Sequence, residues 1–230
     1  MDLQTRKNVG CGPLTPRYDE ALMFAAAHHR QQLRKGSRIP YLSHLMSVSS
    51  LVLEHGGCQD AAIAGLLHDA VEDAPEGQGP AILQEIGARF GDVVQATVAS
   101  CSDGLDDHGN RSGSWAERKL PYVSKLSGKT LEAAMVTAAD KTHNARAIAA
   151  DRILYGSDFL RVFSACEHQL VWYYQEVRDR LNGPLGDSTI REPLRVAVQD
   201  LVAAIRTDPV AAGDQPPPCS CSAGTPAQAT

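Results

Sequence analysis

Residues 65–74 read GLLHDAVEDA, a stretch that combines a helical pattern of apolar residues with four titratable side chains. We expect these residues to form a helix, because apolar residues recur at helical spacing. Each helical residue advances by about 100°, which places His68 about 40° from Glu72, and Asp69 equally far from Asp73. The four side chains would then form one narrow polar stripe on an otherwise apolar helix.

Two interpretations of this stripe are open. Charged helix faces are usually solvated, but histidine is an unusual choice for solvation, and the broad apolar arc predicts packing on more than one side. An enclosed polar stripe is unfavourable unless it binds something. Imidazole and carboxylate are good ligands for a divalent metal ion, so a metal site is the second interpretation. Candidate residues elsewhere in the chain are His44, Asp140 and Asn144.

Composition limits the class of protein. The chain has 230 residues, 43% hydrophobic and 21% charged, which fits one globular domain with a sizeable core. The net charge of −5 argues against a nucleic-acid partner, which needs a broad basic face. The sequence lacks both an apolar leader and a run of about 18 apolar residues, so we expect neither a signal peptide nor a membrane span. Cysteines without CxxC pairs indicate reduced thiols and a cytoplasmic location.

Apolar periodicity predicts an all-α fold without a long strand pattern. We expect helices over residues 18–35, 43–55, 59–74, 81–90, 92–100, 115–126, 130–150, 158–181 and 189–205. They would form one compact multi-helix domain over residues 17–206, between a flexible N-terminus (1–16) and a disordered, Pro-rich tail (207–230). A long polar loop over residues 101–114 interrupts the helices.

The order of His44, the His68–Asp69 pair and Asp140 along the chain resembles that of the HD-domain metal-dependent phosphohydrolases. Over about residues 18–174, the sequence is more closely similar to the hydrolase domain of the RelA/SpoT family, particularly its stand-alone small alarmone hydrolases. The segments that carry this resemblance are RKGSRIPYLSH, GLLHDAVEDA, ERKLPYV and AADKTHNARAI.

The resemblance implies an all-helical HD-domain fold and one Mn²⁺ cofactor. The implied metal ligands are His44, His68, Asp69 and Asp140. The implied acidic pair that positions or deprotonates the attacking water is Glu72 and Asp73. These two carboxylates lie close to each other and to a cation, so the sequence does not assign the base to one of them.

The implied substrates are guanosine tetraphosphate and pentaphosphate, whose 3′-pyrophosphate would be released to leave GDP or GTP. The resemblance places a basic pair near the substrate and an asparagine at the nucleoside, here Arg34, Lys35 and Asn144. From the residues themselves we add two cations and a tyrosine that could close over a base, namely Arg118, Lys119 and Tyr174. A solvated helix start explains the two cations equally well.

Some positions depart from the family pattern. Leu45 follows His44 where the family usually has proline, and Ala147 stands where many relatives have threonine. Two other functions remain open. The metal and the water do not select the substrate, so the protein could be a phosphatase for the 2′-phosphate of NADPH or another HD-type nucleotide phosphohydrolase. It could also be a sensor that binds a nucleotide without turnover. The sequence leaves open the preferred substrate, the physiological metal and the oligomeric state. It also indicates no synthetase or regulatory domain after the helices.

Overall fold

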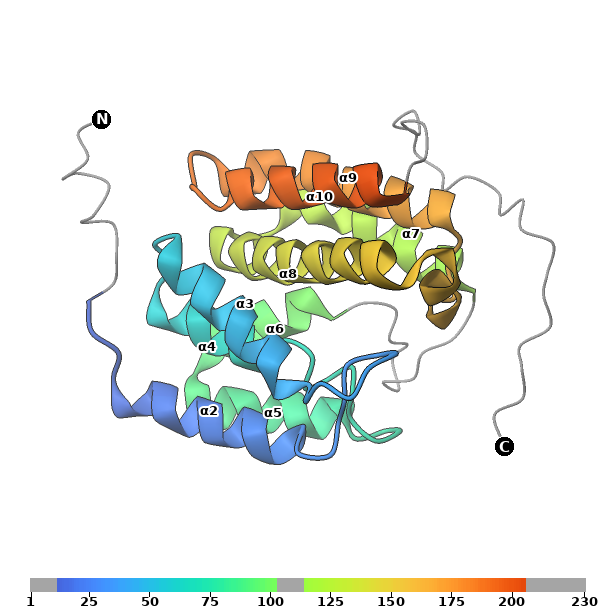
Figure 1. Cartoon of the computed structure of the whole chain (residues 1–230). Helices are drawn as coiled ribbons and strands as arrows, with labels where there is room; N and C mark the ends of the chain where they lie inside the picture. The colour runs from blue at the N-terminus through green and yellow to red at the C-terminus, as the bar shows by residue number, and fades with distance from the viewer. Residues whose placement is uncertain (1–11, 103–113, 206–230) are drawn as a thin grey trace.

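The computed structural model describes residues 12–102 and 114–205, and every regular element in these ranges is an α- or 3₁₀-helix (Figure 1). The all-α class is therefore confirmed. The elements are α2 (Pro16–His28), α3 (Leu42–Glu54), α4 (Gln59–Leu67), α5 (Gly79–Phe90), α6 (Asp92–Cys101), α7 (Trp115–Lys125), η1 (Leu126–Gly128), α8 (Leu131–Tyr155), η2 (Ser157–Val162), α9 (Glu167–Leu185) and α10 (Arg191–Ile205). The predicted disordered tail and most of the predicted polar loop lie outside the described residues. The domain boundaries stay predictions.

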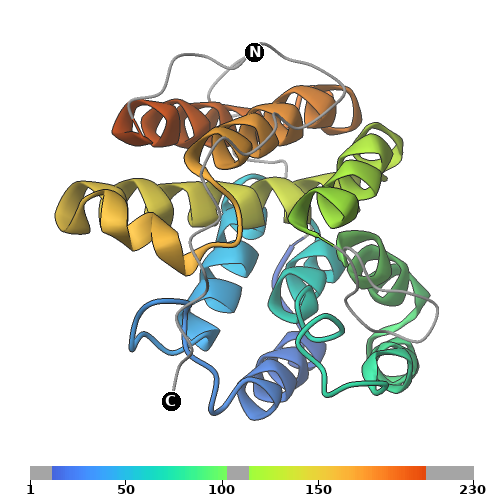
Figure 2. The same ribbon diagram turned by 90° about the vertical axis from the view of Figure 1, so that its right-hand side faces the viewer.

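Helix α8, which is 25 residues long, runs through the centre of the molecule. It lies between α9 and α10 on one side and α3, α4 and α6 on the other (Figures 1 and 2). Its residues 133–140 are all buried, and four of them are alanines whose small side chains let the neighbouring helices approach. The Thr130 side chain caps the first turn by accepting from the Ala133 amide.

A close approach between α3 and α4 brings two of the predicted metal ligands together. Gly65 of α4 packs against Ser49 of α3, and a Cβ atom on Gly65 would lie only 3.2 Å from the Ser49 Cα. A larger side chain at this position would push the two helices apart. His44 near the start of α3 and His68 directly after α4 therefore lie at one junction.

No helix among the described residues is long and apolar enough to cross a membrane.

Three of the predicted helices, over residues 18–35, 130–150 and 158–181, were wrong in extent. Helix α2 ends at His28 rather than at residue 35, because the next residues form a compact loop closed by a bridge between Leu33 and Pro40. The Arg34 amide donates to the Ile39 carbonyl at 2.8 Å within this loop. The predicted helix 158–181 is divided into η2 and α9, and α8 continues to Tyr155, where Gly156 at φ 76° ends it.

The helix predicted over residues 59–74 was also too long, and here the cause lies in the site itself. Helix α4 ends at Leu67, and residues 68–73 form successive turns. His68 Nδ1 lies 2.9 Å from the Gly65 carbonyl, which would accept from the Asp69 amide if the helix continued. Because the side chain takes this acceptor, the helical ladder stops. The helical-wheel argument for Glu72 and Asp73 was therefore wrong.

Candidate active site

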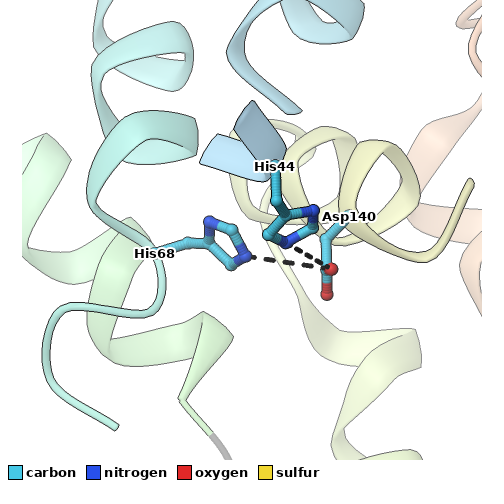
Figure 3. A group of neighbouring side chains, drawn as sticks. All are labelled: His44, His68 and Asp140. Carbon is cyan, nitrogen blue, oxygen red and sulfur yellow. Dashed lines mark ion pairs between the residues drawn. The ribbon is translucent and has the colours of Figure 1, made fainter. Parts of the chain in front are cut away.

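Three of the four predicted metal ligands converge at the junction of α3, the end of α4 and α8. His44, His68 and Asp140 are buried, and each offers one ligand atom within 4.8 Å of the others. Their side chains point toward one another in Figure 3. Asp140 Oδ1 lies 3.3 Å from His44 Nε2 and 3.8 Å from His68 Nε2. We call these three residues, together with Asp69, the ligand cluster.

Asp69 completes the cluster from the turn that follows α4. Its Oδ2 atom lies 2.9 Å from His68 Nε2 and 3.6 Å from His44 Nε2. The Tyr41 hydroxyl donates to the same oxygen at 2.6 Å, which fixes the direction of the carboxylate. The structure therefore brings all four predicted ligands together, from segments that are far apart in the sequence.

The donor set fits a divalent metal ion. The Nε2 atoms of His44 and His68 are buried, and within the described part of the chain they make ion-pair approaches to the two carboxylates but no hydrogen bond. Nδ1 of His68 donates to the Gly65 carbonyl, which leaves the Nε2 lone pair directed into the cluster. Two imidazoles and two carboxylates are a ligand set suited to borderline divalent ions.

Opposite charges hold the cluster together. Burial by itself would raise the pKa of Asp140, but the Lys141 ammonium, 2.6 Å away, and the two histidines lower it well below its ordinary value. Burial would likewise lower the pKa of His68, but Asp69 and Asp140 raise it well above its ordinary value. A bound metal ion needs the unprotonated imidazole, so metal and proton compete for His68.

Lys141 is a site residue that the sequence analysis missed. Its Nζ atom pairs with Asp140 Oδ2, and it lies 5.7 Å from the ring centroids of both Tyr122 and Tyr173. Two aromatic faces and one carboxylate therefore hold the ammonium. Asn144 donates to the other oxygen, Asp140 Oδ1. The position of Lys141 directly after a candidate ligand was a signal in the sequence.

His143 was also missed, because eight histidines in the chain made each one uninformative. Its Nδ1 lies 2.9 Å from His44 Nδ1, so it contacts the ring nitrogen of His44 that faces away from the other ligands. Burial, together with the nearby His44 and Arg34, lowers the pKa of His143 to about 4. The spacing of three residues from Asp140 on one helix would have placed both on the same face.

The acidic pair lies in the turns after α4, directly beyond His68 and Asp69. Glu72 is half-buried and Asp73 is exposed. Asp73 Oδ2 accepts from Gln32 Nε2 at 2.8 Å, and Gln32 Oε1 lies 2.5 Å from Nδ1 of the buried His29. An ionised carboxylate only accepts hydrogen bonds, so it fixes the orientation of the Gln32 amide, and His29 Nδ1 must then be the donor to Oε1.

His29 also braces the ligand cluster. Its ring stacks on Tyr41 with the centroids 5.4 Å apart, and Tyr41 donates to Asp69. One buried side chain at the end of α2 thus supports both the acidic pair and the cluster. His29, Gln32 and Tyr41 were not predicted as site residues, because nothing in the local pattern shows that these contacts form.

A pocket of about 390 Å³ adjoins the cluster. We call it the α8 pocket. Four of the six predicted substrate-binding residues line it, namely Arg34, Lys35, Asn144 and Tyr174. The rest of the lining is formed by Ser37, Ile39, Tyr41, Ser43, His143, Ala147, Ile148, Asp151, Phe159 and Phe163.

Basic side chains lie beside aromatic rings in this pocket. Arg34 donates to Asn144 at 2.7 Å, and its guanidinium lies 5.8 Å from the Tyr41 ring centroid. Lys35 Nζ lies 5.5 Å from the ring centroid of Phe163. The pocket therefore offers positive charge for phosphates and flat apolar surfaces for a base.

The other two predicted substrate-binding residues lie outside this lining, on α7. Lys119 Nζ is 5.0 Å from the ring centroid of Tyr173, which also faces Lys141. Lys119 thus lies beside the Lys141–Asp140 pair rather than in the pocket. Arg118 is half-buried in the first turn of α7, where its amide donates to the Ser114 carbonyl. Contacts of either residue with substrate stay predictions.

A family model for the HD domain matches residues 21–166. The chain belongs to the HD domain family. The guanosine-3′,5′-bis(diphosphate) 3′-pyrophosphohydrolase MESH1 of Xenopus tropicalis is 33% identical to this HD domain protein over 130 residues, which cover 55% of this chain and 66% of the relative. MESH1 of Drosophila melanogaster is 30% identical over 133 residues, covering 56% of this chain and 68% of the relative. The predicted relationship to the RelA/SpoT-type hydrolases is confirmed.

Solved structures show the same HD-domain fold. A metazoan ortholog of SpoT that hydrolyzes ppGpp matches with a TM-score of 0.63 at 22% identity, over 84% of this chain and 97% of that chain. The protein lmo0812 from Listeria monocytogenes EGD-e matches with a TM-score of 0.60 at 26% identity, over 71% of this chain and 99% of that chain. The chain spans 66% of the length of the Xenopus, mouse and human MESH1 relatives, slightly less than two thirds.

Proposed function

We propose that this HD domain protein is a Mn²⁺-dependent hydrolase that removes the 3′-pyrophosphate of guanosine tetraphosphate and pentaphosphate. The observation that carries the proposal is the convergence of four metal-ligand side chains beside a basic, aromatic pocket of nucleotide size. The names of the MESH1 relatives, which act on guanosine-3′,5′-bis(diphosphate), support the substrate.

His44, His68, Asp69 and Asp140 are the proposed metal ligands. When bound, a divalent ion lowers the pKa of water and neutralises charge on phosphoryl oxygens. The protein's own contribution is to hold the ligands in place: Gly65, His143, Tyr41 and Lys141 each contact one of them. Such supporting contacts commonly tune metal affinity.

The remaining residues act on water and substrate. Glu72 or Asp73 accepts a proton from the water whose oxygen bonds to the 3′-phosphorus. The bond between that phosphorus and the ribose 3′-oxygen breaks, the 3′-oxygen takes up a proton, and pyrophosphate leaves. Arg34 and Lys35 bind phosphates, and Arg118 and Lys119 add positive charge from α7. Asn144 and Tyr174 contact the nucleoside.

Product analysis tests the proposal. The full chain is stripped with EDTA, reloaded with Mn²⁺, Mg²⁺ or Zn²⁺, and incubated with ppGpp, pppGpp and NADPH. We expect pyrophosphate and GDP or GTP from the first two substrates, with Mn²⁺ as the most active ion, and no turnover in EDTA. Turnover that survives EDTA treatment would contradict the metal dependence.

Other products would identify the alternatives. Inorganic phosphate from NADPH, without pyrophosphate from ppGpp, would make the protein a 2′-phosphatase. Tight binding of ppGpp without any product, with every metal, would make it a nucleotide sensor.

We also propose a cytoplasmic location. Imaging of the tagged full chain would test this location.

A further inference from the structure

The α8 pocket contains an acidic side chain that the proposed reaction does not use. Asp151 lines the pocket two turns beyond Asn144 on α8 and is half-buried. Its carboxylate has no hydrogen bond or ion pair with another residue of the described ranges. Three other polar side chains of the wall are engaged: Arg34 donates to Asn144, and the Ser37 hydroxyl donates to a backbone carbonyl.

The length of α8 sets what can reach this carboxylate. Asp140 in the ligand cluster and Asp151 lie three turns apart, a rise of about 16 Å, which is comparable to the length of a nucleotide. The pocket wall near the cluster is formed by residues that touch the ligands, namely Tyr41, His143 and Asn144. Beyond α8, the wall continues with Phe159 and Phe163, whose rings can stack on a base.

A nucleotide whose 3′-phosphates lie at the ligand cluster therefore extends its base toward Asp151. A carboxylate repels phosphate and, when ionised, only accepts hydrogen bonds. The base is the part of the substrate that supplies N–H donors. Guanine presents N1–H and the N2 amino group side by side on one edge, and the two carboxylate oxygens can accept from both. Adenine presents one amino group next to N1, whose lone pair would face a carboxylate oxygen. Two acceptors in contact repel each other, so adenine fits less well.

We propose that Asp151 selects guanine by accepting hydrogen bonds from N1–H and the N2 amino group of the base. This inference rests on the proposed function. It also distinguishes the two enzymatic alternatives, because the phosphorylated nucleoside of NADPH is an adenosine.

The substitution Asp151→Asn tests the proposal by changing the specificity. An amide offers one acceptor and one donor, which match the N1–H donor and the O2 acceptor of xanthine. The kcat and KM for pyrophosphate release are measured with the 3′,5′-bis(diphosphates) of guanosine, xanthosine and adenosine. We expect kcat/KM for the guanosine substrate to fall about tenfold to a hundredfold, mainly through KM, and kcat/KM for the xanthosine substrate to rise.

Asp158→Asn is the matched control. Asp158 is an exposed carboxylate of η2 that pairs with Arg161 and lies outside the pocket lining, so its removal should leave all three substrates unaffected. An equal loss for the three bases in Asp151→Asn, or no change at all, would overturn the proposal. A merely structural role of Asp151 cannot produce improved use of xanthosine.

A binding measurement separates this inference from the proposed function. If the wild-type protein releases no pyrophosphate from any substrate, the proposed function fails. Calorimetric titration with GDP, XDP and ADP then still tests Asp151. We expect the wild-type protein to bind GDP more tightly than XDP, and Asp151→Asn to reverse this order. Equal affinities of the wild-type protein for GDP and XDP would refute the inference.

Discussion

Two residues of the ligand cluster, His68 and Asp69, adjoin the acidic pair in sequence, but the protein holds the cluster and the pair very differently. Each side chain of the cluster is held by a neighbour: His44 by His143, His68 by the Gly65 carbonyl, Asp69 by Tyr41 and Asp140 by Lys141. Asp73, by contrast, is exposed in a turn and is tied to the loop after α2 through Gln32. An ion needs a fixed, closed set of donors, whereas a proton acceptor must reach water. The two regions should therefore fail in different ways.

Removing a ligand should have the largest effect. We expect His68→Ala and Asp69→Ala each to abolish metal binding and activity together, because both side chains are proposed ligands and partly neutralise one another. Elemental analysis of the purified variants measures the metal directly. Asp158→Ala, on the exposed surface, is the control. Full metal occupancy in either ligand variant would contradict the assignment.

Removing the acidic pair should lower the rate but leave the metal in place. Glu72→Gln combined with Asp73→Asn preserves the shape of the side chains and removes the proposed base, so we expect kcat to fall on the order of 10²- to 10⁴-fold. Nucleotide binding should persist or tighten, because two negative charges leave the site of a polyanion. Metal content, nucleotide affinity and kcat are the readouts. A normal kcat would show that Glu72 and Asp73 have no catalytic role and are merely solvated, and loss of the metal would show that they belong to the ligand set.

A smaller effect is expected from the side chain that ties the acidic turn to α2. In Gln32→Leu, Asp73 loses its amide donor and the buried His29 loses its acceptor. We expect kcat to fall about tenfold to a hundredfold with KM and metal content unchanged, since a small misplacement of a catalytic group is costly. Gln31→Leu, at the exposed neighbouring position, should match the wild-type protein. Parallel losses in both variants would indicate general destabilisation instead.

The smallest effect, on the pH dependence of stability, is expected from His143, which contacts the ligand His44. The pKa of His143 is lowered to about 4, mainly by burial, so the folded protein keeps this imidazole neutral while the unfolded chain takes up a proton below pH 6.5. Its contribution to stability is therefore complete above pH 6.5 and is lost as the pH falls toward 4. We expect His143→Asn to reduce the difference in the free energy of unfolding between pH 7 and pH 5. Urea titrations of the metal-free proteins measure it, and an unchanged difference would contradict this account.

The fold class and the candidate ligands were accessible from the sequence because their signals are local or match known motifs. Apolar residues at helical spacing predicted α3, α5 and α6 nearly to the residue. The motifs around His44, His68 and Asp140 indicated ligands that the structure then brought together. The residues that support these ligands were less accessible, because Tyr41 has no pattern that distinguishes it from a core residue, and Lys141 is marked only by its position directly after Asp140.

Helix ends show where local reasoning stops. Periodicity over residues 59–74 favoured one continuous helix, yet the His68 side chain takes the Gly65 carbonyl and ends α4 at Leu67. The His68 imidazole and the backbone amide of Asp69 compete for one acceptor, the Gly65 carbonyl. The outcome depends on the position of the imidazole, and the packing of α3 and α8 beside it sets this position.

The sequence by itself determined that this protein is helical, and it supplied the candidate residues for binding a metal ion and a polyanion. These properties follow from residue chemistry and from the 3.6-residue period of the helix. Only the tertiary structure decided that Arg34 meets Asn144, 110 positions away, that His143 holds His44, and that Asp151 faces the same pocket. Such contacts arise because helices pack wherever their apolar faces fit together, and the packing brings together polar side chains that have no relation along the chain.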